Sequence, residues 1–196
     1  MGYDEVFKAV PSVVQAISVA VTAFFAVKSL RAWRVQLVGK RHFEAAEQVI
    51  GAVYDVREAL SYMRRSYYLT EDTRDRPRPD AESELDARQR DACFIIEHRF
   101  NEASEKFSAL RTARLLCTIH FTTAAVTGID EIFNVRNKIY VMLGLANSYV
   151  GKPLHSAEAD RMLSAIWARD DETDEMSKQI ASAVAKIEEV CAPYLK

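Results

Sequence analysis

Histidine is the side chain in this sequence best suited to proton transfer or metal binding near neutral pH. The four histidines are scattered along the chain, at His42, His98, His120 and His155. A di-metal carboxylate bundle needs Glu-x-x-His pairs that point inward, and no glutamate here has a histidine three residues later. Glu97 and His98 are adjacent and therefore point to different sides of a helix. The histidine spacing therefore predicts no metal site.

The cysteines are the next candidates for chemistry, as nucleophiles, disulfides or zinc ligands. There are three, Cys93, Cys117 and Cys191. Their odd number and wide spacing do not fit a disulfide framework. None belongs to a CxxC pair, so a zinc site is not indicated either. We expect small buried thiols in a reducing compartment.

One further pair of residues has a spacing associated with catalysis. Arg114 and His120 form an Arg-x5-His pattern near the end of a predicted helix. The pattern resembles the Arg-x(4–6)-His pair of HEPN-type ribonucleases, which are helical bundles. That resemblance implies that Arg114 would hold a phosphate and His120 would move a proton. Leu115 follows the arginine where those enzymes usually place a polar residue, and arginines are frequent in this chain, so a ribonuclease is kept as an alternative hypothesis.

Other signatures of catalysis or nucleotide binding are missing from the sequence. No serine lies in a GxSxG motif, and the glycines are isolated rather than grouped in a phosphate-binding loop. The net charge of -2 gives no electrostatic case for a nucleic-acid partner, because phosphate binding needs a basic surface. The sequence therefore predicts no cofactor, no metal and no nucleic acid, and it favours a non-enzymatic protein.

The element that stands out is an apolar stretch near the N-terminus. No residue from Ala9 to Val27 is charged. A run of about 19 such residues is long enough to cross the hydrocarbon core of a bilayer as a helix. Pro11 falls in the first turn, where its missing N–H is tolerated. We therefore expect residues 1–28 to be a membrane anchor.

The residues on either side of this stretch predict its orientation. Only Asp4, Glu5 and Lys8 are charged before it, whereas five basic residues follow it, namely Lys28, Arg31, Arg34, Lys40 and Arg41. Basic residues are retained on the cytoplasmic side, so we expect the N-terminus outside and the rest of the chain in the cytoplasm. The residues expected at the two membrane interfaces are Tyr3, Phe7, Lys28, Arg31, Trp33 and Arg34. The basic group would also attract anionic lipid head groups.

Two other interpretations of the apolar stretch compete with the membrane anchor. A cleaved signal peptide needs a basic segment before the apolar run, and that segment is missing. A buried helix of a soluble protein is the second alternative. It is kept open by a polar stripe formed by Gln15, Ser18 and Thr22.

Small residues recur every fourth position in the same stretch. They are Ser12, Ala16 and Ala20, a small-xxx-small pattern that lets two membrane helices approach closely. Gln15 could donate or accept a hydrogen bond across such a contact. The pattern gives the hypothesis that the protein forms a homo-oligomer through this helix, and chance in a stretch rich in Ala, Ser and Val is the competing explanation.

Residues 29–68 are predicted to continue the anchor as one long helix. An alternating spacing of four and three residues places a set of apolar side chains on one stripe, typical of a helix packed in a bundle; the set is Val49, Val53, Val56, Leu60, Met63 and Tyr67. Arg57, Arg64 and Arg65 fall mostly off that stripe. Residues 69–80 contain Pro77, Pro79 and dense mixed charge, which predicts a loop open to disorder and proteolysis.

Residues 81–196 are predicted to supply the remaining helices of the bundle. One helix is expected from about 81 to 117, with a stripe of Ile96, Ala103, Phe107 and Leu110, and a break is expected among the threonines and Gly128. A further helix is expected from 129 to 149. Ser156 is expected to cap a short helix that ends near Trp167, and Thr173 is expected to cap the last one.

The stretch after the apolar run resembles a group of bacterial membrane-anchored helical proteins of unknown function. The shared features are a Trp-basic-x-Gln-Leu-x-Gly-Lys stretch, a Val-Tyr-x-Val-Arg stretch and a closing Pro-Tyr-Leu-Lys; here they comprise Trp33, Arg34, Gln36, Leu37, Gly39, Lys40, Val53, Tyr54, Val56, Arg57 and residues 193–196. The Thr-rich stretch near His120 departs from the acidic helix expected there. The resemblance implies an anchor and a bundle and carries no activity.

The sequence thus predicts an all-α protein, with an N-terminal transmembrane helix followed by an antiparallel helical bundle. We expect a single-pass protein of a bacterial inner membrane that acts as an interaction, scaffold or sensor protein. Its expected partners are the lipid bilayer, a second copy of the chain and a protein that the sequence does not identify. A HEPN-like ribonuclease and a soluble protein with a buried first helix are the alternatives.

Overall fold

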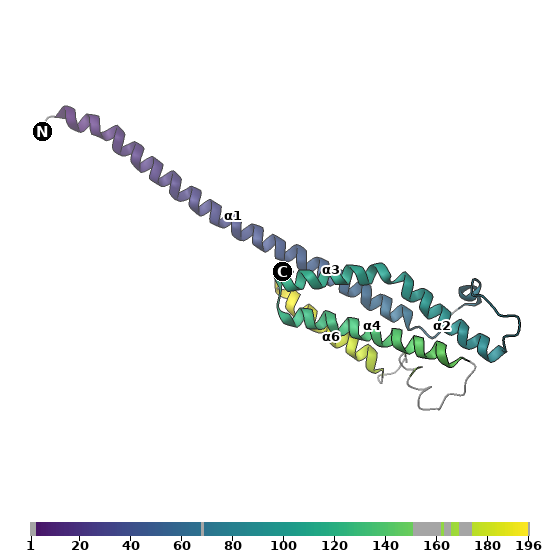
Figure 1. Ribbon diagram of the computed structural model, residues 1–196. Coiled ribbons are helices and arrows are strands. Elements are labelled where there is room, and N and C mark those ends of the chain that lie inside the picture. The colour runs from purple at the N-terminus through teal and green to yellow at the C-terminus, as the bar shows by residue number, and fades with distance from the viewer. Residues whose placement is uncertain (1–2, 68, 151–161, 163–165, 169–173, 196) are drawn as a thin grey trace. The chain divides into compact units, whose positions relative to one another are not determined.

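The computed structural model describes residues 3–67, 69–150, 162, 166–168 and 174–195, and within these ranges it leaves the side chains of 3–13, 16 and 70 undescribed. The described residues are mostly helical and contain no β-strand (Figure 1). The α-helices are α1 (Tyr3–Met63), α2 (Glu84–Glu102), α3 (Ser104–His120), α4 (Thr123–Tyr149) and α6 (Glu175–Cys191). Two short 3-10 helices are η1 (Thr70–Thr73) and η2 (Ala192–Tyr194). The predicted all-α class is confirmed.

The chain divides into two compact units, and α1 contributes to both. Unit 1 is Met1–Glu44 and unit 2 is Ala45–Lys196. In unit 1, none of the described side chains is buried, and Leu37 and His42 are half-buried. Burial begins at Ala45 and Ala46, the first residues of unit 2. Unit 2 therefore contains the core.

The helices of unit 2 form a bundle in which α3 and α4, α4 and α6, and α1 and α6 run antiparallel. Between α3 and α4 the contacts are Phe107–Phe133 and Arg114–Asp130, and between α4 and α6 they are Glu131–Lys186 and Lys138–Gln179. Between α1 and α6 they are Tyr54–Glu188, in the body of α6, and Arg64–Asp174, at its start. In each pair of helices, contacts further along one helix are made to residues earlier in the other. Each couple is therefore antiparallel, as predicted for the bundle.

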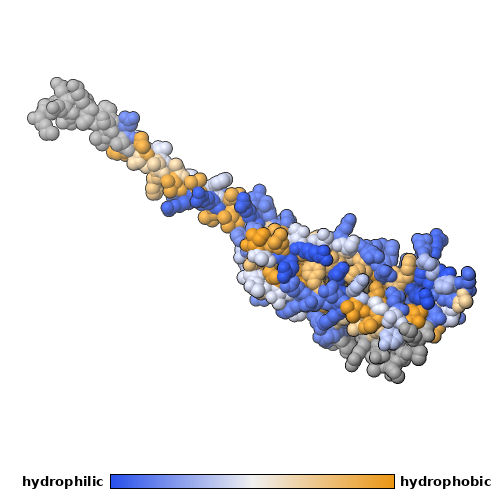
Figure 2. Space-filling model, in the orientation of Figure 1, coloured by the Kyte–Doolittle hydropathy of each residue, from blue (hydrophilic) through white to orange (hydrophobic). Residues whose placement is uncertain are grey.

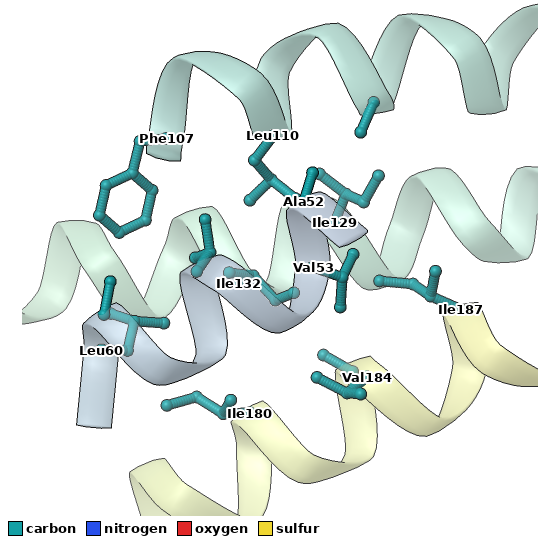
Figure 3. Close-up of a cluster of buried hydrophobic side chains, with 14 of the residues drawn as sticks. Ala52, Val53, Leu60, Phe107, Leu110, Ile129, Ile132, Ile180, Val184 and Ile187 are labelled. Carbon is teal, nitrogen blue, oxygen red and sulfur yellow. The ribbon is translucent and has the colours of Figure 1, made fainter. Parts of the chain in front are cut away.

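The core of unit 2 is a continuous cluster of apolar side chains from α1, α2, α3, α4 and α6, part of which is drawn in Figure 3. Its labelled members are Ala52, Val53 and Leu60 of α1, Phe107 and Leu110 of α3, Ile129 and Ile132 of α4, and Ile180, Val184 and Ile187 of α6. They recur at helical spacing, so each helix presents one apolar stripe to the others. Burial of such side chains is the main favourable term in the stability of the bundle.

The end of α1 is set by a buried arginine from another helix. α1 ends at Met63, whereas the sequence predicted a helix to residue 68. The Arg99 guanidinium of α2 donates to the carbonyl oxygens of Arg65 at 2.9 Å and Tyr67 at 3.0 Å. A cation that satisfies carbonyls just beyond a helix C-terminus stabilises the chain reversal there. Tyr67 consequently leaves the predicted stripe and is 66% exposed.

The predicted helix from 81 to 117 is two helices, α2 and α3, separated at Ala103. α2 begins at Glu84 because the Ser83 hydroxyl accepts a hydrogen bond from the Asp86 backbone N–H at 3.2 Å, which is an N-cap. The stripe predicted for this region is confirmed, since Ile96, Ala103, Phe107 and Leu110 are buried.

The predicted loop before α2 is held against the bundle by a buried arginine. Arg76 is buried, and its guanidinium donates to Glu82 at 2.6 Å and to Asp91 at 2.5 Å. Two carboxylates around one guanidinium hold the loop against the start of α2. Pro77 and Pro79 therefore prevent a helix here without leaving the segment unattached.

The break predicted between His120 and Gly128 is present, but Gly128 itself lies inside a helix. The break falls at Phe121 and Thr122, and α4 begins at Thr123. A Cβ at residue 128 would lie 2.8 Å from Ile187 Cγ1 and 2.9 Å from the Ala183 carbonyl oxygen. The glycine is thus explained by the close approach of α4 to α6 and not by a turn.

The end of the chain follows the prediction only in part. α6 begins at Glu175 with Asp174 in the N-cap position, whereas Thr173, the predicted cap, lies outside the described residues. The predicted short helix from Ser156 also lies largely outside them. Pro193 falls within η2, directly after α6, as expected for a helix end.

Candidate functional site

The described surface of unit 1 is apolar on most sides of α1. The exposed large hydrophobic side chains, each between 48% and 65% exposed, are Val14, Ile17, Val19, Val21, Phe24, Phe25, Val27 and Leu30. At 100° per residue these positions do not form a single stripe, in contrast to an amphipathic helix. Figure 2 shows hydrophobic residues recurring along this unit, with hydrophilic patches between them.

The polar stripe predicted in the same segment is largely satisfied within the helix. The Ser18 hydroxyl donates to the Val14 carbonyl oxygen at 2.9 Å, and the Thr22 hydroxyl donates to the Ser18 carbonyl oxygen at 2.8 Å. Hydroxyls bonded in this way to the preceding turn need no partner from water or from another chain. Gln15 is exposed. The Ser and Thr of the stripe therefore do not require burial against protein.

The basic residues that follow are all exposed. Lys28, Arg31, Arg34, Lys40 and Arg41 are interrupted by no acidic residue. Lys40 approaches Glu44 at 3.6 Å as an exposed ion pair one turn apart, and such pairs contribute little to stability. The segment from 28 to 41 is therefore a row of cations on the surface of unit 1.

Of the remaining residues predicted at the membrane interface or in the oligomer contact, only some have described side chains. Trp33 is 58% exposed, and Ala20 is exposed as well. The predicted positions whose side chains lie outside the described ones are Tyr3, Phe7, Ser12 and Ala16.

No helix within the part of the chain whose side chains are described is long and apolar enough to cross a membrane. The predicted span, Ala9 to Val27, is only partly within that part, because it begins before Val14 and includes Ala16.

In unit 2 the most buried polar group is Arg64, which the sequence placed off the core stripe. Its side chain is 1% exposed, and its two Nη atoms donate to the Asp174 carboxylate at 2.8 and 2.9 Å. The Ser177 hydroxyl donates to the same carboxylate at 2.6 Å. Burial by itself would raise the pKa of Asp174, but the hydrogen bonds from Arg64 and Ser177 outweigh it and hold that pKa below its usual value.

Arg64 also joins the end of α1 to the segment before α6. Its Nη2 donates to the Trp167 carbonyl oxygen at 3.3 Å, and its own carbonyl oxygen accepts from the Ala168 N–H at 2.7 Å. A helical position one turn after Leu60 could have revealed this burial, but the partner Asp174 is far away in the sequence. The cluster is structural, since a buried, bidentate ion pair is costly to break from one side.

A cleft of about 530 Å³ lies beside this cluster, between α1 and α6. Leu60, Ile180 and Ala181 line it together with Ser61 and Arg57. At its rim the Tyr54 hydroxyl donates to Glu188, and this hydrogen bond raises the pKa of Tyr54. A tyrosine with a raised pKa is a poor acid at neutral pH.

The structure does not bring Arg114 and His120 together on one face of α3. Two residues six positions apart on a helix lie 120° apart around its axis and about 9 Å apart along it. Arg114 lies instead against Asp130, with Nε–Oδ1 at 2.6 Å and Nη2–Oδ2 at 3.0 Å. This hydrogen-bonded pairing raises the pKa of Arg114 and lowers that of Asp130. His120 ends α3 with its ring centroid 6.3 Å from that of Phe121, and the ribonuclease hypothesis stays a prediction.

The cysteines are buried and free, as predicted. Burial raises the pKa of Cys93 to about 11, of Cys117 to about 12 and of Cys191 to about 11. Thiols with such values remain protonated at neutral pH and are poor nucleophiles. Among the described residues, no group of His, Cys, Asp and Glu is arranged to hold a metal ion.

Comparison with known proteins adds no relative to this picture: no family model, curated protein or solved structure matches the chain. The resemblance to bacterial membrane-anchored proteins therefore stays a prediction. Any account of function has to come from the residues themselves.

Proposed function

We propose that this chain is a membrane-tethered interaction protein, with the N-terminal helix as the tether and the bundle of unit 2 as the partner-binding part. The observation that carries the proposal is the exposure of large apolar side chains around the helix from Val14 to Leu30. Exposed apolar surface of this extent has to be covered by lipid or by protein. The charge-free run of the sequence extends further, back to Ala9.

The hydrogen bonding of the polar stripe favours lipid over protein as the cover. A helix packed in a protein core normally presents polar groups to partners on one side. Here the Ser18 and Thr22 hydroxyls are satisfied by the carbonyls of their own helix. Such hydroxyls are tolerated in hydrocarbon, where no water can replace a missing partner.

The charges support an orientation with the bundle in the cytoplasm of a bacterium. The cations from Lys28 to Arg41 lie directly after the apolar segment, where an inward-facing flank is expected. Trp33 lies among them and suits the lipid–water interface. Protease added to spheroplasts should then leave unit 2 intact, and digestion of unit 2 would reverse the orientation.

A non-enzymatic role is proposed for unit 2. Arg64 and Asp174, two buried polar residues of its described part, are engaged with each other. The cysteine thiols are protonated and buried. These arrangements favour an interaction, scaffold or sensor protein over an enzyme.

Contact between copies through the membrane helix is a further part of the proposal. Ala20 is exposed and lies one turn after Ala16 and two after Ser12 in the sequence. Chemical crosslinking in native membranes should trap an oligomer that Ala16→Leu weakens, because a large side chain prevents close approach. An oligomer unchanged by Ala16→Leu would contradict the proposed contact between copies.

Fractionation of the full-length protein tests the tether. Membranes washed with alkaline sodium carbonate should retain the protein, and detergent should release it. Val21→Asp combined with Phe24→Asp should move it to the soluble fraction, because two charges in the apolar segment cost several kcal/mol in a bilayer. Leu85→Asp is the matched control, since Leu85 is an exposed apolar residue of unit 2. Extraction of the unmodified protein by carbonate would contradict the proposal.

A further inference from the structure

Arg136 of α4 lies on an aromatic platform in unit 2. Its guanidinium carbon is 4.5 Å from the ring centroid of Phe100 and 5.0 Å from that of Phe107. The two rings are nearly parallel, with 25° between their planes and 6.3 Å between their centroids. Cation–π contact of this kind fixes the plane of the guanidinium group.

The hydrogen bonding of Arg136 is incomplete. Its Nη1 donates to the Asn137 side-chain oxygen at 3.3 Å, whereas its Nε is buried and has no acceptor among the described residues. Arg64, Arg76 and Arg114 each pair with a carboxylate, and Arg99 donates to backbone carbonyl oxygens, whereas no hydrogen bond of Arg136 to either kind of acceptor occurs among the described residues. Burial and the positive charge of Arg111 lower the pKa of Arg136.

Arg111 of α3 adds a second positive charge beside it. α3 and α4 are aligned by the contacts Phe107–Arg136 and Arg114–Asp130. Arg111 lies one turn after Phe107 and one turn before Arg114 on α3, so it shares their face and lies opposite the same stretch of α4. The Arg111 side chain is exposed, and no ion pair of it with a carboxylate occurs in the described structure.

Tyr140 extends the group by one helical turn. Its ring is 5.4 Å from that of Phe100, and the residue is 61% exposed. The tyrosine therefore lies at an exposed edge of the aromatic platform.

We propose that Arg111 and Arg136 form a binding site for a phosphate-class oxyanion on the α3–α4 face of unit 2. Two guanidinium groups without a carboxylate match the double charge of a phosphate monoester better than the single charge of a carboxylate. The planar donors of both arginines suit phosphate oxygens, and the aromatic platform fixes one of them in advance. The phosphate could come from a small soluble molecule or from a lipid head group.

This site does not depend on the proposed tether, because its residues all belong to unit 2. Inorganic phosphate is the probe for the first experiment, with sulfate as a second oxyanion of similar shape. The measurement is a calorimetric or NMR titration of the full chain in detergent, with the Nε–H signal of Arg136 as the local readout. We expect saturable binding together with a shift of that signal.

Three variants make the titration decisive. Arg111→Gln removes an exposed charge and leaves the packing unchanged, so it should fold and lose about tenfold in phosphate affinity, as expected for one charge-assisted hydrogen bond. Arg136→Met keeps the apolar stem on the aromatic platform and should lose at least as much. Arg88→Gln removes an equal charge from an exposed ion pair on α2 and should bind as the unmodified protein does.

Vesicles distinguish the two sources of phosphate. The affinities of the unmodified protein and of Arg111→Gln are compared for phosphatidylcholine vesicles with and without phosphatidic acid. A difference between the two proteins that appears only with phosphatidic acid supports a lipid head group, and phosphate binding without that difference supports a soluble ligand. The proposal is overturned if phosphate binding is not saturable, or if Arg111→Gln binds as tightly as Arg88→Gln.

Discussion

The two parts of α1 carry different apolar patterns on one helix. In unit 2 the apolar residues from Val49 to Met63 form a single buried stripe, with polar residues elsewhere on the helix. In unit 1 the large apolar residues described from Val14 to Leu30 occupy most sides of the helix and are exposed. Since the backbone is helical in both parts, the difference has to arise from what covers each surface. The bundle covers the first, and we propose that lipid covers the second.

The largest expected effect comes from placing the same charge in each part. Val53→Asp buries a carboxylate at a position that is 0% exposed, so it should cost more than about 4 kcal/mol and prevent unit 2 from folding. Val21→Asp adds the same charge at an exposed position and should leave the unfolding of unit 2 unchanged. Circular dichroism during urea unfolding in detergent measures the stability of unit 2 in both variants. Equal loss of stability in the two variants would remove the distinction between the units.

Breaking the buried ion pair is the next largest effect. Asp174→Ala leaves the Arg64 guanidinium buried without its carboxylate, and such a loss costs about 3–5 kcal/mol. Asp130→Ala is the matched control, because it breaks the Arg114 pair, whose side chains are both 45% exposed, and should change stability little. Urea unfolding midpoints compare the two. Similar midpoints would show that the Arg64 cluster does not hold α1 to α6.

Two glycines of α4 test the close packing of α4 and α6. Gly128→Ala places a Cβ 2.8 Å from Ile187, so it should destabilise unit 2 by about 1–3 kcal/mol. Gly144→Ala meets nothing within 4 Å and should stabilise α4 by up to about 1 kcal/mol, because alanine is the better helix former. Thermal unfolding should therefore move in opposite directions. Shifts of the same sign would contradict the packing.

The smallest expected effect is a dependence of the stability of unit 2 on pH. The pKa of Asp174 is lowered in the folded state, so its ionised form stabilises the fold. That contribution is complete above the unfolded value of about 3.9 and is lost as the pH falls through the folded value. The difference in unfolding free energy between the unmodified protein and Asp174→Asn should shrink as the pH is lowered from about 6 to about 3. A difference that stays constant would show that Asp174 does not titrate as described.

The helices and the core could be predicted from the sequence because both depend on local periodicity. Val49, Val53, Val56, Leu60 and Met63 were placed by their spacing, and all are buried. The break at Ala103 was not predicted, since no proline or glycine marks it. The position of Gly128 inside α4 was missed for a related reason, because a glycine selected for close packing looks in the sequence like a turn residue.

The polar interior could not be predicted in the same way. Arg64 was placed off the core stripe, although it is buried, because its partner Asp174 lies on another element. Arg99 and Arg136 were likewise not singled out, since carbonyls and aromatic rings that receive a guanidinium leave no local pattern. Residue type alone makes an arginine look exposed. Only the tertiary structure shows which arginines are enclosed.

Site-directed spin labelling in liposomes tests the central claim most directly. A label on a cysteine introduced at Val21 is compared with one at Tyr62, an exposed residue of unit 2. The native cysteines are buried with raised pKa values and should resist labelling. If lipid covers unit 1, the Val21 label will collide more often with oxygen, which enters hydrocarbon, than with a water-soluble nickel chelate, and the Tyr62 label will show the reverse. A Val21 label that responds like the Tyr62 label would contradict the membrane tether.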